Sequence, residues 1–324
     1  MEIETLSQSS LLNALRAAGE STRLRMLAIL SRSELTVTEL TRILGQSQPR
    51  VSRHLKLMCE GHLLKRYREG SWVLYRISHT GSAASLVREL IRLLPDDDPE
   101  LERDRQRLSV IREEHARKAA DYFQKIATRW DSIRELYVAE EDVERAMLAA
   151  VEDIDIDFLL DLGTGTGRVL EIFGPRIGTG LGIDLSREML GVARLKLGSA
   201  DIDHCHVRHG DIYNLGVDGA SVDVATIHHV LHFLDDPAMV VAEAVRTLRP
   251  GGRLLIVDFA PHHIDVLRDE HAHRRLGFSD EEVNDWLRRA GARCRAVHHL
   301  TTGSGAENGD HLVVTLWVGE TEVA

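Results

Sequence analysis

The stretch DLGTGTGRVLEI, residues 161–172, lies near the middle of this 324-residue chain and decides the fold of its second half. An apolar segment that predicts a strand precedes it, and it leads into an amphipathic run that predicts a helix. Gly163, Gly165 and Gly167 let the backbone turn sharply and let a ligand approach the peptide plane without a Cβ in the way. The stretch therefore predicts a ligand-binding turn, with a purely structural turn as the simpler alternative.

The spacing of the glycines separates two classes of ligand. A dinucleotide-binding turn has the pattern G-x-G-x-x-G, whose third glycine would stand where this chain has Arg168. The pattern here is G-x-G-x-G, and Asp161 precedes it. A carboxylate beside the loop repels a pyrophosphate but suits a ligand that carries an ammonium and a sulfonium group. The loop therefore favours S-adenosylmethionine over a nicotinamide dinucleotide.

Strands alternate with helices after residue 155, which is typical of a doubly wound parallel sheet with an antiparallel edge. The predicted strands cover residues 157–162, 179–184, 204–210, 222–230, 251–259, 293–300 and 311–319. Asp184 ends the second strand, where a carboxylate can accept both hydroxyls of a ribose. Asp211 follows the third strand, where a carboxylate can accept an adenine amino group.

These features, in this order, resemble the class I S-adenosylmethionine-dependent methyltransferases, and most of all the small-molecule type related to ubiquinone and menaquinone biosynthesis. The resemblance covers roughly residues 117–320 and implies a Rossmann-like α/β domain that binds S-adenosylmethionine or S-adenosylhomocysteine. The implied cofactor contacts are Asp161, Gly163, Gly165, Asp184, Leu185, Asp211, Ile212 and His228. In this family a lid often precedes the first strand, and Tyr122, Phe123 and Trp130 would occupy that place, although packing of a helix on the sheet explains the same aromatics.

The first 94 residues differ in charge from the rest of the chain. They hold 14 Lys and Arg against 8 Asp and Glu, a balance of +6, whereas the remainder holds 26 against 43, a balance of −17. A basic head of this size can bind nucleic acid, which an acidic body would repel. Two short helices over residues 36–61, followed by a two-stranded wing around Glu69 and Gly70, predict a winged helix-turn-helix.

The second of these helices carries the short polar and long basic side chains that contact base edges and phosphates. The predicted DNA contacts are Ser47, Gln48, Arg50, Ser52, Arg53 and Lys56 in that helix and Arg66 and Arg68 in the wing. Val51, Leu55 and Leu57 are expected to supply its inward face.

Residues 11–80 resemble the ArsR/SmtB winged-helix regulators, with SQPRVSRHLKLM as the recognition helix and REGSWVLYRI as the wing. The resemblance implies binding to double-stranded operator DNA. Many members hold soft metals through cysteines in the helix before the turn, where this chain has Thr36 and Thr38. Hydroxyls do not hold soft metals, so we expect no metal sensing at that position.

The segment PDDDPELERD, residues 95–104, predicts a linker because it is rich in proline and acids. The expected organisation is an all-α winged helix-turn-helix domain over residues 1–94, an acidic linker and the start of a connecting helix over 95–116, and a methyltransferase-like domain over 117–324. Leu86, Leu90, Ile91 and Leu94 form an apolar stripe with little to cover it. A homodimer on a palindromic operator is therefore expected.

Cysteine and histidine usage narrows the chemistry further. Cys59, Cys205 and Cys294 are too few and too far apart for a disulfide framework or for arsenic methylation, and they suit a reducing cytoplasm. The acidic start and the lack of a long apolar run predict a cytoplasmic chain without a membrane partner. No histidine pair has the spacing of a zinc enzyme, so no dedicated metal site is expected. His228, His229 and His232, around the fourth strand end, are candidates for a catalytic base, with a structural role as the alternative.

Two functions remain open from the sequence. The chain is either a DNA-binding regulator whose second domain senses S-adenosylmethionine or its demethylated product, or an active methyltransferase on a small molecule whose head controls its expression. Both need the same cofactor residues, and methyl transfer needs only proximity and in-line alignment. The motifs therefore do not separate them.

Overall fold

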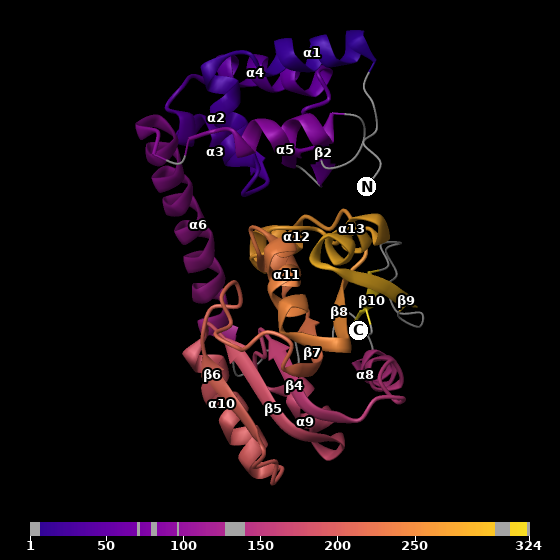
Figure 1. The fold of residues 1–324 in the computed structure, drawn as a ribbon. Helices are drawn as coiled ribbons and strands as arrows, with labels where there is room; N and C mark the ends of the chain where they lie inside the picture. Colours follow the sequence, from indigo (N-terminus) through magenta and orange to yellow (C-terminus); the bar gives the residue numbers. More distant parts are fainter. Residues whose placement is uncertain are drawn as a thin grey trace. The chain divides into compact units, whose positions relative to one another are not determined.

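The computed structural model describes residues 7–69, 72–78, 83–95, 97–126, 140–301 and 312–322 (Figure 1). The chain forms two compact units, residues 1–117 and 118–324. Two features predicted from the sequence, the lid residue Trp130 and the turn glycine Gly70, lie outside the described residues, as do the side chains of Tyr122 and Phe123. Within the described part, no helix is long and apolar enough to cross a membrane.

The first unit is a winged helix-turn-helix. Its elements are α1 (Gln8–Ala18), α2 (Ser21–Leu30), β1 (Leu35–Thr36), α3 (Val37–Leu44), α4 (Gln48–Glu60), β2 (Leu64–Glu69), β3 (Trp72–Ile77), α5 (Ala84–Arg92) and α6 (Pro99–Ile126). The three strands form an antiparallel sheet in the order β1-β3-β2. The predicted helical domain is confirmed, but its description as all-α omits the wing strands, which pair with each other and with the short strand before α3.

Local signals place the helix-turn-helix. The Thr36 side chain accepts the Glu39 backbone N–H, and the Glu39 carboxylate accepts the Thr36 N–H, so α3 begins with a complete capping box. Gly45 ends α3 in the left-handed region, with φ 64°, a conformation that glycine adopts without strain. The chain then turns directly into α4.

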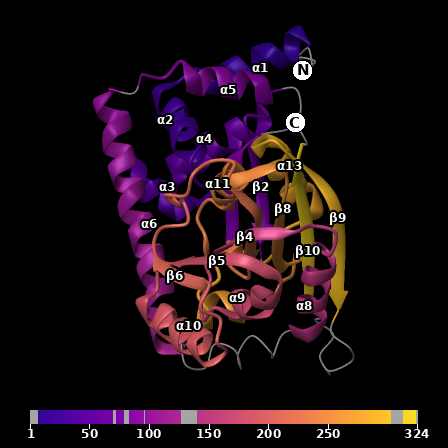
Figure 2. The ribbon, with the colours of Figure 1, turned by 60° about the horizontal axis from the view of Figure 1, so that its bottom comes forward.

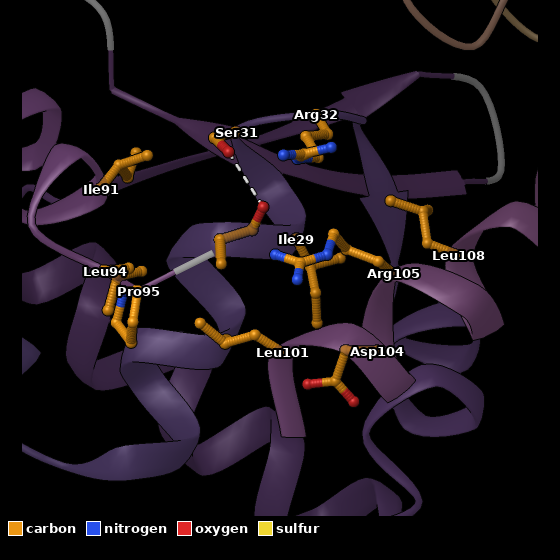
Figure 3. Close-up of a pocket in the computed structure, with 11 residues that line it drawn as sticks. Ile29, Ser31, Arg32, Ile91, Leu94, Pro95, Leu101, Asp104, Arg105 and Leu108 are labelled. Carbon is orange, nitrogen blue, oxygen red and sulfur yellow. Dashed lines mark hydrogen bonds between the residues drawn. The ribbon is translucent and has the colours of Figure 1, made fainter. Parts of the chain in front are cut away.

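Helix α6 is part of the first unit up to Arg117 and is not a loose linker there. Its Leu108 and Ile111 are buried in the same core as Met26, Leu40 and Leu55. Together with α2 and α5 it encloses a small cavity of about 100 Å³, which has Ile29, Ile91, Leu101 and Asp104 among its lining residues (Figure 3). The segment 95–104, expected to be an acidic linker, thus includes a residue, Asp104, that is buried at the core of the first unit.

The apolar stripe expected to form a dimer surface is partly covered by its own domain. Leu86, Leu90 and Ile91 pack against the core of the first unit. Large apolar side chains remain exposed elsewhere, at Leu11, Leu12 and Leu15 on α1. Leu93, which directly follows α5, is exposed as well.

The second unit is an α/β fold around one sheet. Its elements are α8 (Glu140–Ala149), β4 (Ile156–Leu162), α9 (Arg168–Phe173), η2 (Gly174–Arg176), β5 (Ile177–Asp184), α10 (Arg187–Ser199), β6 (Cys205–His209), β7 (Val222–His228), η3 (Leu231–Phe233), α11 (Pro237–Thr247), β8 (Leu248–Phe259), α12 (Val266–Glu270), α13 (Asp280–Ala290), β9 (Ala292–Thr301) and β10 (Val313–Thr321). Each of the seven predicted strands has a counterpart in this series.

The strand order is β6-β5-β4-β7-β8-β10-β9, and Figure 2 shows the sheet running from β6 to β9. The first five strands in this order are parallel, whereas β10 is antiparallel to both of its neighbours. The carboxyl ends of β4 to β8 therefore meet along one edge. Ligands of open α/β sheets bind at this edge.

Alternate residues of β8 face two separate cores. Leu254 and Ile256 pack with α11 and α13, whereas Leu255 and Val257 pack with α8 and α9. This period of two is what a strand covered by helices on both faces requires.

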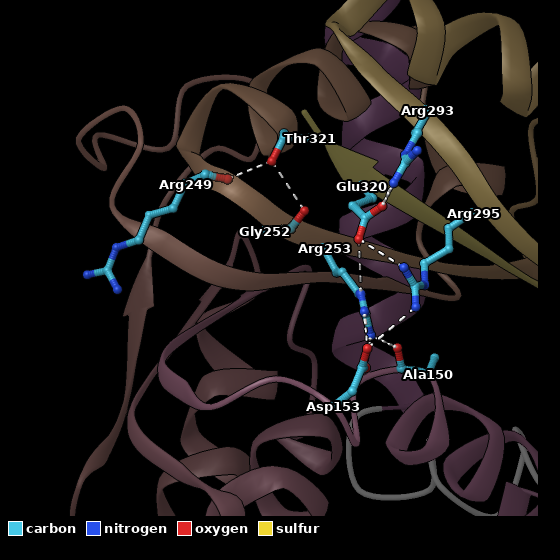
Figure 4. Close-up of polar contacts among 9 residues, drawn as sticks. All are labelled: Ala150, Asp153, Arg249, Gly252, Arg253, Arg293, Arg295, Glu320 and Thr321. Carbon is cyan, nitrogen blue, oxygen red and sulfur yellow. Dashed lines mark hydrogen bonds and ion pairs between the residues drawn. The ribbon is translucent and has the colours of Figure 1, made fainter. Parts of the chain in front are cut away.

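A network of arginines and acids ties the segment before β4 to the other half of the sheet (Figure 4). The buried Arg253 of β8 donates to Asp153, with 2.7 Å from Nη2 to Oδ2, and to the carbonyl of Ala150 at 2.6 Å. Glu320 of β10 accepts from Arg293 and Arg295 of β9. The pKa of Asp153 is lowered to about 2, mainly by its hydrogen bond from Arg253.

Candidate functional site

The glycine loop between β4 and α9 has the backbone that the sequence predicted. Gly163, Gly165 and Gly167 all adopt positive φ, at 71°, 52° and 80°. A Cβ on Gly163 would lie 2.5 Å from Cγ2 of Val230, and a Cβ on Gly167 would lie 3.1 Å from that of Ala193. Gly163 is therefore fixed both by its conformation and by the chain after β7, which passes directly against it.

Asp161 lies beneath this loop and is 1% exposed. It pairs in register with Thr226 of β7, whose hydroxyl donates to Asp161 Oδ1 at 2.6 Å. The neighbouring strand thus orients the carboxylate at the carboxyl end of β4.

Asp184, at the end of β5, is bound to the loop. Its Oδ2 accepts the Gly165 N–H at 2.9 Å, and its Oδ1 accepts the Ser186 N–H at 2.7 Å. Burial raises the pKa of Asp184 above 3.8, although these backbone hydrogen bonds lower it. A carboxylate offers about four lone-pair sites, and the backbone N–H groups of Gly165, Ser186 and Leu185 occupy three of them, so the arrangement holds the group in place and still leaves room to accept a hydroxyl of a ligand.

The other predicted cofactor contacts divide into exposed and buried residues. Leu185 is 56% exposed, and Asp211 is exposed and accepts the Tyr213 N–H at 2.9 Å. Ile212 is 5% exposed and packs in the core with Leu215 and Ile183. Asp184 and Asp211 follow neighbouring strands, since β5 pairs with β6.

Histidines gather where β7 and β8 end. His228 and His232 are buried, and His229 is buried with a left-handed backbone, φ 55°. The Asp258 carboxylate accepts from His232 Nδ1 at 2.7 Å and from the His232 backbone N–H at 3.3 Å. Burial alone would raise the pKa of Asp258, but the charge and hydrogen bond of His232 outweigh it and lower the pKa.

Two further histidines complete this group. The ring of His273 stacks on that of His232, with centroids 4.0 Å apart, and burial lowers the pKa of His273 well below 6.5. Burial also lowers the pKa of His262 to about 4. Sequence reasoning noticed the histidines but missed Asp258, whose place in an apolar strand end, LLIVDF, was the available signal.

The predicted recognition helix presents its polar face to solvent. The exposed residues are Ser47, the N-cap of α4, then Gln48, Arg50, Ser52, Arg53 and Lys56 of α4, and Arg66 and Arg68 of β2. Val51, Leu55 and Met58 are the buried face. Leu57 is 40% exposed, so its assignment to the inward face was wrong; Met58, one residue on, takes that place.

The threonines that replace metal-binding cysteines have a structural role at one position. Thr36 is the N-cap of α3, and its hydroxyl donates to Glu39 Oε2 at 2.9 Å. Thr38 is exposed on α3.

Comparison with known proteins assigns both units. The family model "Methyltransferase domain" matches residues 160–256, and "Bacterial regulatory protein, arsR family" matches residues 20–61. A demethylmenaquinone methyltransferase from Thermobifida fusca is 32% identical over 53% of this chain and 72% of its own length. An uncharacterized 37.1 kDa protein in transposon TN4556 of Streptomyces fradiae is 36% identical over 36% of this chain, which spans only 34% of that relative.

The fold of the second unit is also found among solved structures. The YcgJ protein of Bacillus subtilis has a TM-score of 0.50 and 20% identity, with 57% of this chain and 100% of that one covered. At this identity the likeness concerns the fold alone. The family models and the Thermobifida fusca relative show that the chain belongs to the S-adenosylmethionine-dependent methyltransferases, here with the class I fold, and that it carries an ArsR-family helix-turn-helix domain ahead of the methyltransferase domain.

Proposed function

We propose that the chain is a DNA-binding transcriptional regulator of the ArsR type whose methyltransferase domain binds S-adenosylmethionine or S-adenosylhomocysteine, and that the bound form sets its affinity for operator DNA. The observation that carries this proposal is the attachment of α6. This one helix runs from Pro99 to Ile126, past the boundary of the two units at Arg117, and its residues between Asp104 and Glu114 contact the helix-turn-helix through charged side chains.

Those contacts reach both α2 and α3. Asp104 of α6 accepts two hydrogen bonds from Arg25, and Glu114 accepts two from Arg42. Arg107 donates to the carbonyl of Ile43 at 2.8 Å, next to the turn of the motif. A ligand that changes the order or position of the carboxyl-terminal part of α6 would therefore act on α3, which supports α4.

The residues at the carboxyl edge of the second unit fit the cofactor. Three left-handed glycines at alternate positions leave the loop backbone open, and Asp184 is held by that loop at the position where ribose hydroxyls are accepted in this fold. The Oγ1 of Thr164, in the same loop, is buried without a hydrogen-bond partner among the described residues. When bound, S-adenosylmethionine supplies an electrophilic methyl group, and S-adenosylhomocysteine has the same adenosine without it.

We also propose that the regulator acts as a cytoplasmic homodimer, with Leu11, Leu12 and Leu15 of α1 as the apolar surface for the second copy. A single winged helix contacts few base pairs, and two-fold pairing doubles the contacts on a palindrome. Leu12→Lys should shift sedimentation at micromolar concentration from dimer to monomer. Leu195→Lys, at a leucine 75% exposed on α10, is the matched control and should leave the dimer intact.

The decisive experiment is an operator titration at fixed salt with no ligand, with S-adenosylmethionine and with S-adenosylhomocysteine. Only a difference in affinity for the DNA-competent and DNA-incompetent states shifts binding. We expect operator affinity to differ several-fold between the two forms, a coupling of roughly 1–3 kcal/mol. Three identical curves would contradict the regulator and leave the second candidate.

That second candidate is methyl transfer to a small molecule. The name of the Thermobifida fusca relative, a demethylmenaquinone methyltransferase, favours it. The buried Asp258–His232 pair also favours it, because a carboxylate that orients an imidazole is a common arrangement for a general base. Incubating the chain with labelled S-adenosylmethionine and a metabolite extract tests it directly, and an unlabelled extract would count against it.

A further inference from the structure

The histidine group at the ends of β7 and β8 has a composition that the regulator does not require. Three of its members, His229, His232 and Asp258, each offer one ligand atom, and these atoms lie within 4.8 Å of one another. All three residues are buried. From this geometry we infer a binding site for a divalent transition-metal ion of the zinc type, held by His229, His232 and Asp258.

The donor set selects the class of ion. Imidazole nitrogens with one carboxylate oxygen suit zinc and its neighbours, whereas calcium and magnesium prefer oxygen ligands throughout. Ligand atoms bonded to one zinc ion at about 2.0–2.2 Å lie roughly 3–3.5 Å apart, so side-chain shifts on the order of 1 Å close the site, and the proton that His232 Nδ1 shares with Asp258 is released to solvent as the ion binds. Three protein ligands leave a fourth position, as zinc sites that bind water or substrate do.

The surroundings give an independent reason to expect a ligand here. His273, 6% exposed, stacks on His232, and its Nδ1 has no hydrogen-bond partner among the described residues. The Nε2 of His262 is also buried and has no hydrogen-bond partner among the described residues. Buried polar atoms of this kind call for an ion or an ordered water nearby.

The backbone conformation of His229 also supports a binding site here. A non-glycine residue at φ 55° is uncommon, and such conformations gather at functional sites. The conformation is held in place, because the His229 N–H donates to the Val257 carbonyl at 2.8 Å. The next residue, Val230, packs against Gly163, so the proposed metal site lies beside the glycine loop.

The sequence hid this site because its ligands do not follow a motif. His229 and His232 are three residues apart across an irregular turn, and Asp258 comes from the next strand of the sheet. Only the parallel pairing of β7 and β8 brings them together.

The test is binding of Zn²⁺ alone to the full chain, without cofactor or DNA, so that its result is independent of the proposed function. We expect one tight equivalent per chain by competition with a chromophoric chelator. With Co²⁺ in its place, we expect the strong visible absorption of a four-coordinate ion. His229→Gln should weaken zinc binding by more than about 100-fold. Mutation of a residue that only hydrogen-bonds a metal ligand already lowers metal affinity roughly 10–100-fold, and loss of a ligand itself should cost more.

His206→Gln is the matched control, since His206 is exposed on β6. It should keep both the affinity and the cobalt spectrum. Circular dichroism of each variant checks the fold, and Asp258→Asn provides a second, nearly isosteric ligand loss if His229→Gln unfolds. The assignment is overturned if the wild-type chain binds no zinc ion tightly, or if both ligand variants bind zinc as tightly as the wild type. It is also overturned if His206→Gln loses as much zinc affinity as the ligand variants.

Discussion

The Asp104 carboxylate accepts two hydrogen bonds from the Arg25 guanidinium, at 2.6 Å to Oδ2 and 2.8 Å to Oδ1, across 79 positions of the chain. The side chain of Asp104 is 2% exposed and that of Arg25 is 14% exposed. The pair joins α2 to α6 inside the first unit. It makes the segment after the winged helix a structural part of the head.

Removing one partner of this pair should strongly destabilise the first unit. Asp104→Ala leaves the largely buried Arg25 charge with only the more distant and exposed carboxylate of Glu100, at 3.7 Å, and breaking a buried pair costs up to about 3–5 kcal/mol. Glu114→Ala, on the same helix, removes an exposed pair with Arg42 and should change the free energy of unfolding very little, because solvent screens such pairs. Urea unfolding curves, monitored by hydrogen exchange of the backbone amides in α2 and α3, measure the change in stability of each variant. Equal losses would mean that the Arg25–Asp104 pair does not anchor α6.

How much of this could be read from the sequence depends on the range of the interactions. The backbone of the glycine loop, the seven strands and the two helices of the helix-turn-helix rest on local patterns of two to four residues, and these predicted them correctly. The Arg25–Asp104 pair could not be found this way, because an acid in a proline-rich run looks solvated until the helix is packed. The His232–Asp258 pair was missed for a similar reason, since it joins the turn after β7 to the end of β8, and only the pairing of those two strands brings them together.

The glycine loop should tolerate no side chain at its first glycine. Gly163→Ala places a Cβ 2.5 Å from Val230 and holds alanine at φ 71°, a conformation that alone costs roughly 1–2 kcal/mol. Gly191→Ala is the matched control, because a Cβ there meets nothing within 4 Å and the position is inside α10. It should gain about 0.5–1 kcal/mol from helix propensity. We expect the melting temperature to fall in Gly163→Ala and to rise in Gly191→Ala. A shift of both melting temperatures in the same direction would contradict this prediction.

Cofactor affinity should depend on Asp184. Asp184→Asn removes the charge and turns one of the two acceptor oxygens into a donor, and a charge-assisted hydrogen bond is worth about 1.5–3 kcal/mol, or roughly 10–150-fold in affinity. Asp203→Asn, at an exposed aspartate before β6, should change nothing. Calorimetry with S-adenosylhomocysteine measures both. Since burial raises the pKa of Asp184, wild-type affinity should also begin to fall at a higher pH than an ordinary aspartate would give.

Acid stability of the second unit should depend on Asp153. Its pKa is about 2 in the folded chain against a usual 3.8, because Arg253 stabilises the charged form. A lowered pKa adds stability that is complete above pH 3.8 and is lost as the pH falls toward 2. Asp153→Asn should therefore be less stable than the wild type at neutral pH, and the difference should shrink over this window. Circular dichroism unfolding curves from about pH 2 to 7 check it, and a difference independent of pH would exclude the ion pair as its cause.

Operator binding should lose both affinity and salt dependence when a recognition-helix arginine is removed. Arg53 is exposed on α4, and its contact to a phosphate would release about one counterion. Arg53→Ala should therefore weaken binding and reduce the slope of log affinity against log salt by about 1. Arg88→Ala removes an equally charged, exposed arginine from α5 and should leave the slope unchanged. The measurement is a series of fluorescence titrations between about 50 and 200 mM salt, on a duplex selected by the wild-type chain from random sequences. If the two variants behave alike, the charge of the head acts only as a diffuse field, and α4 is not the element that contacts DNA.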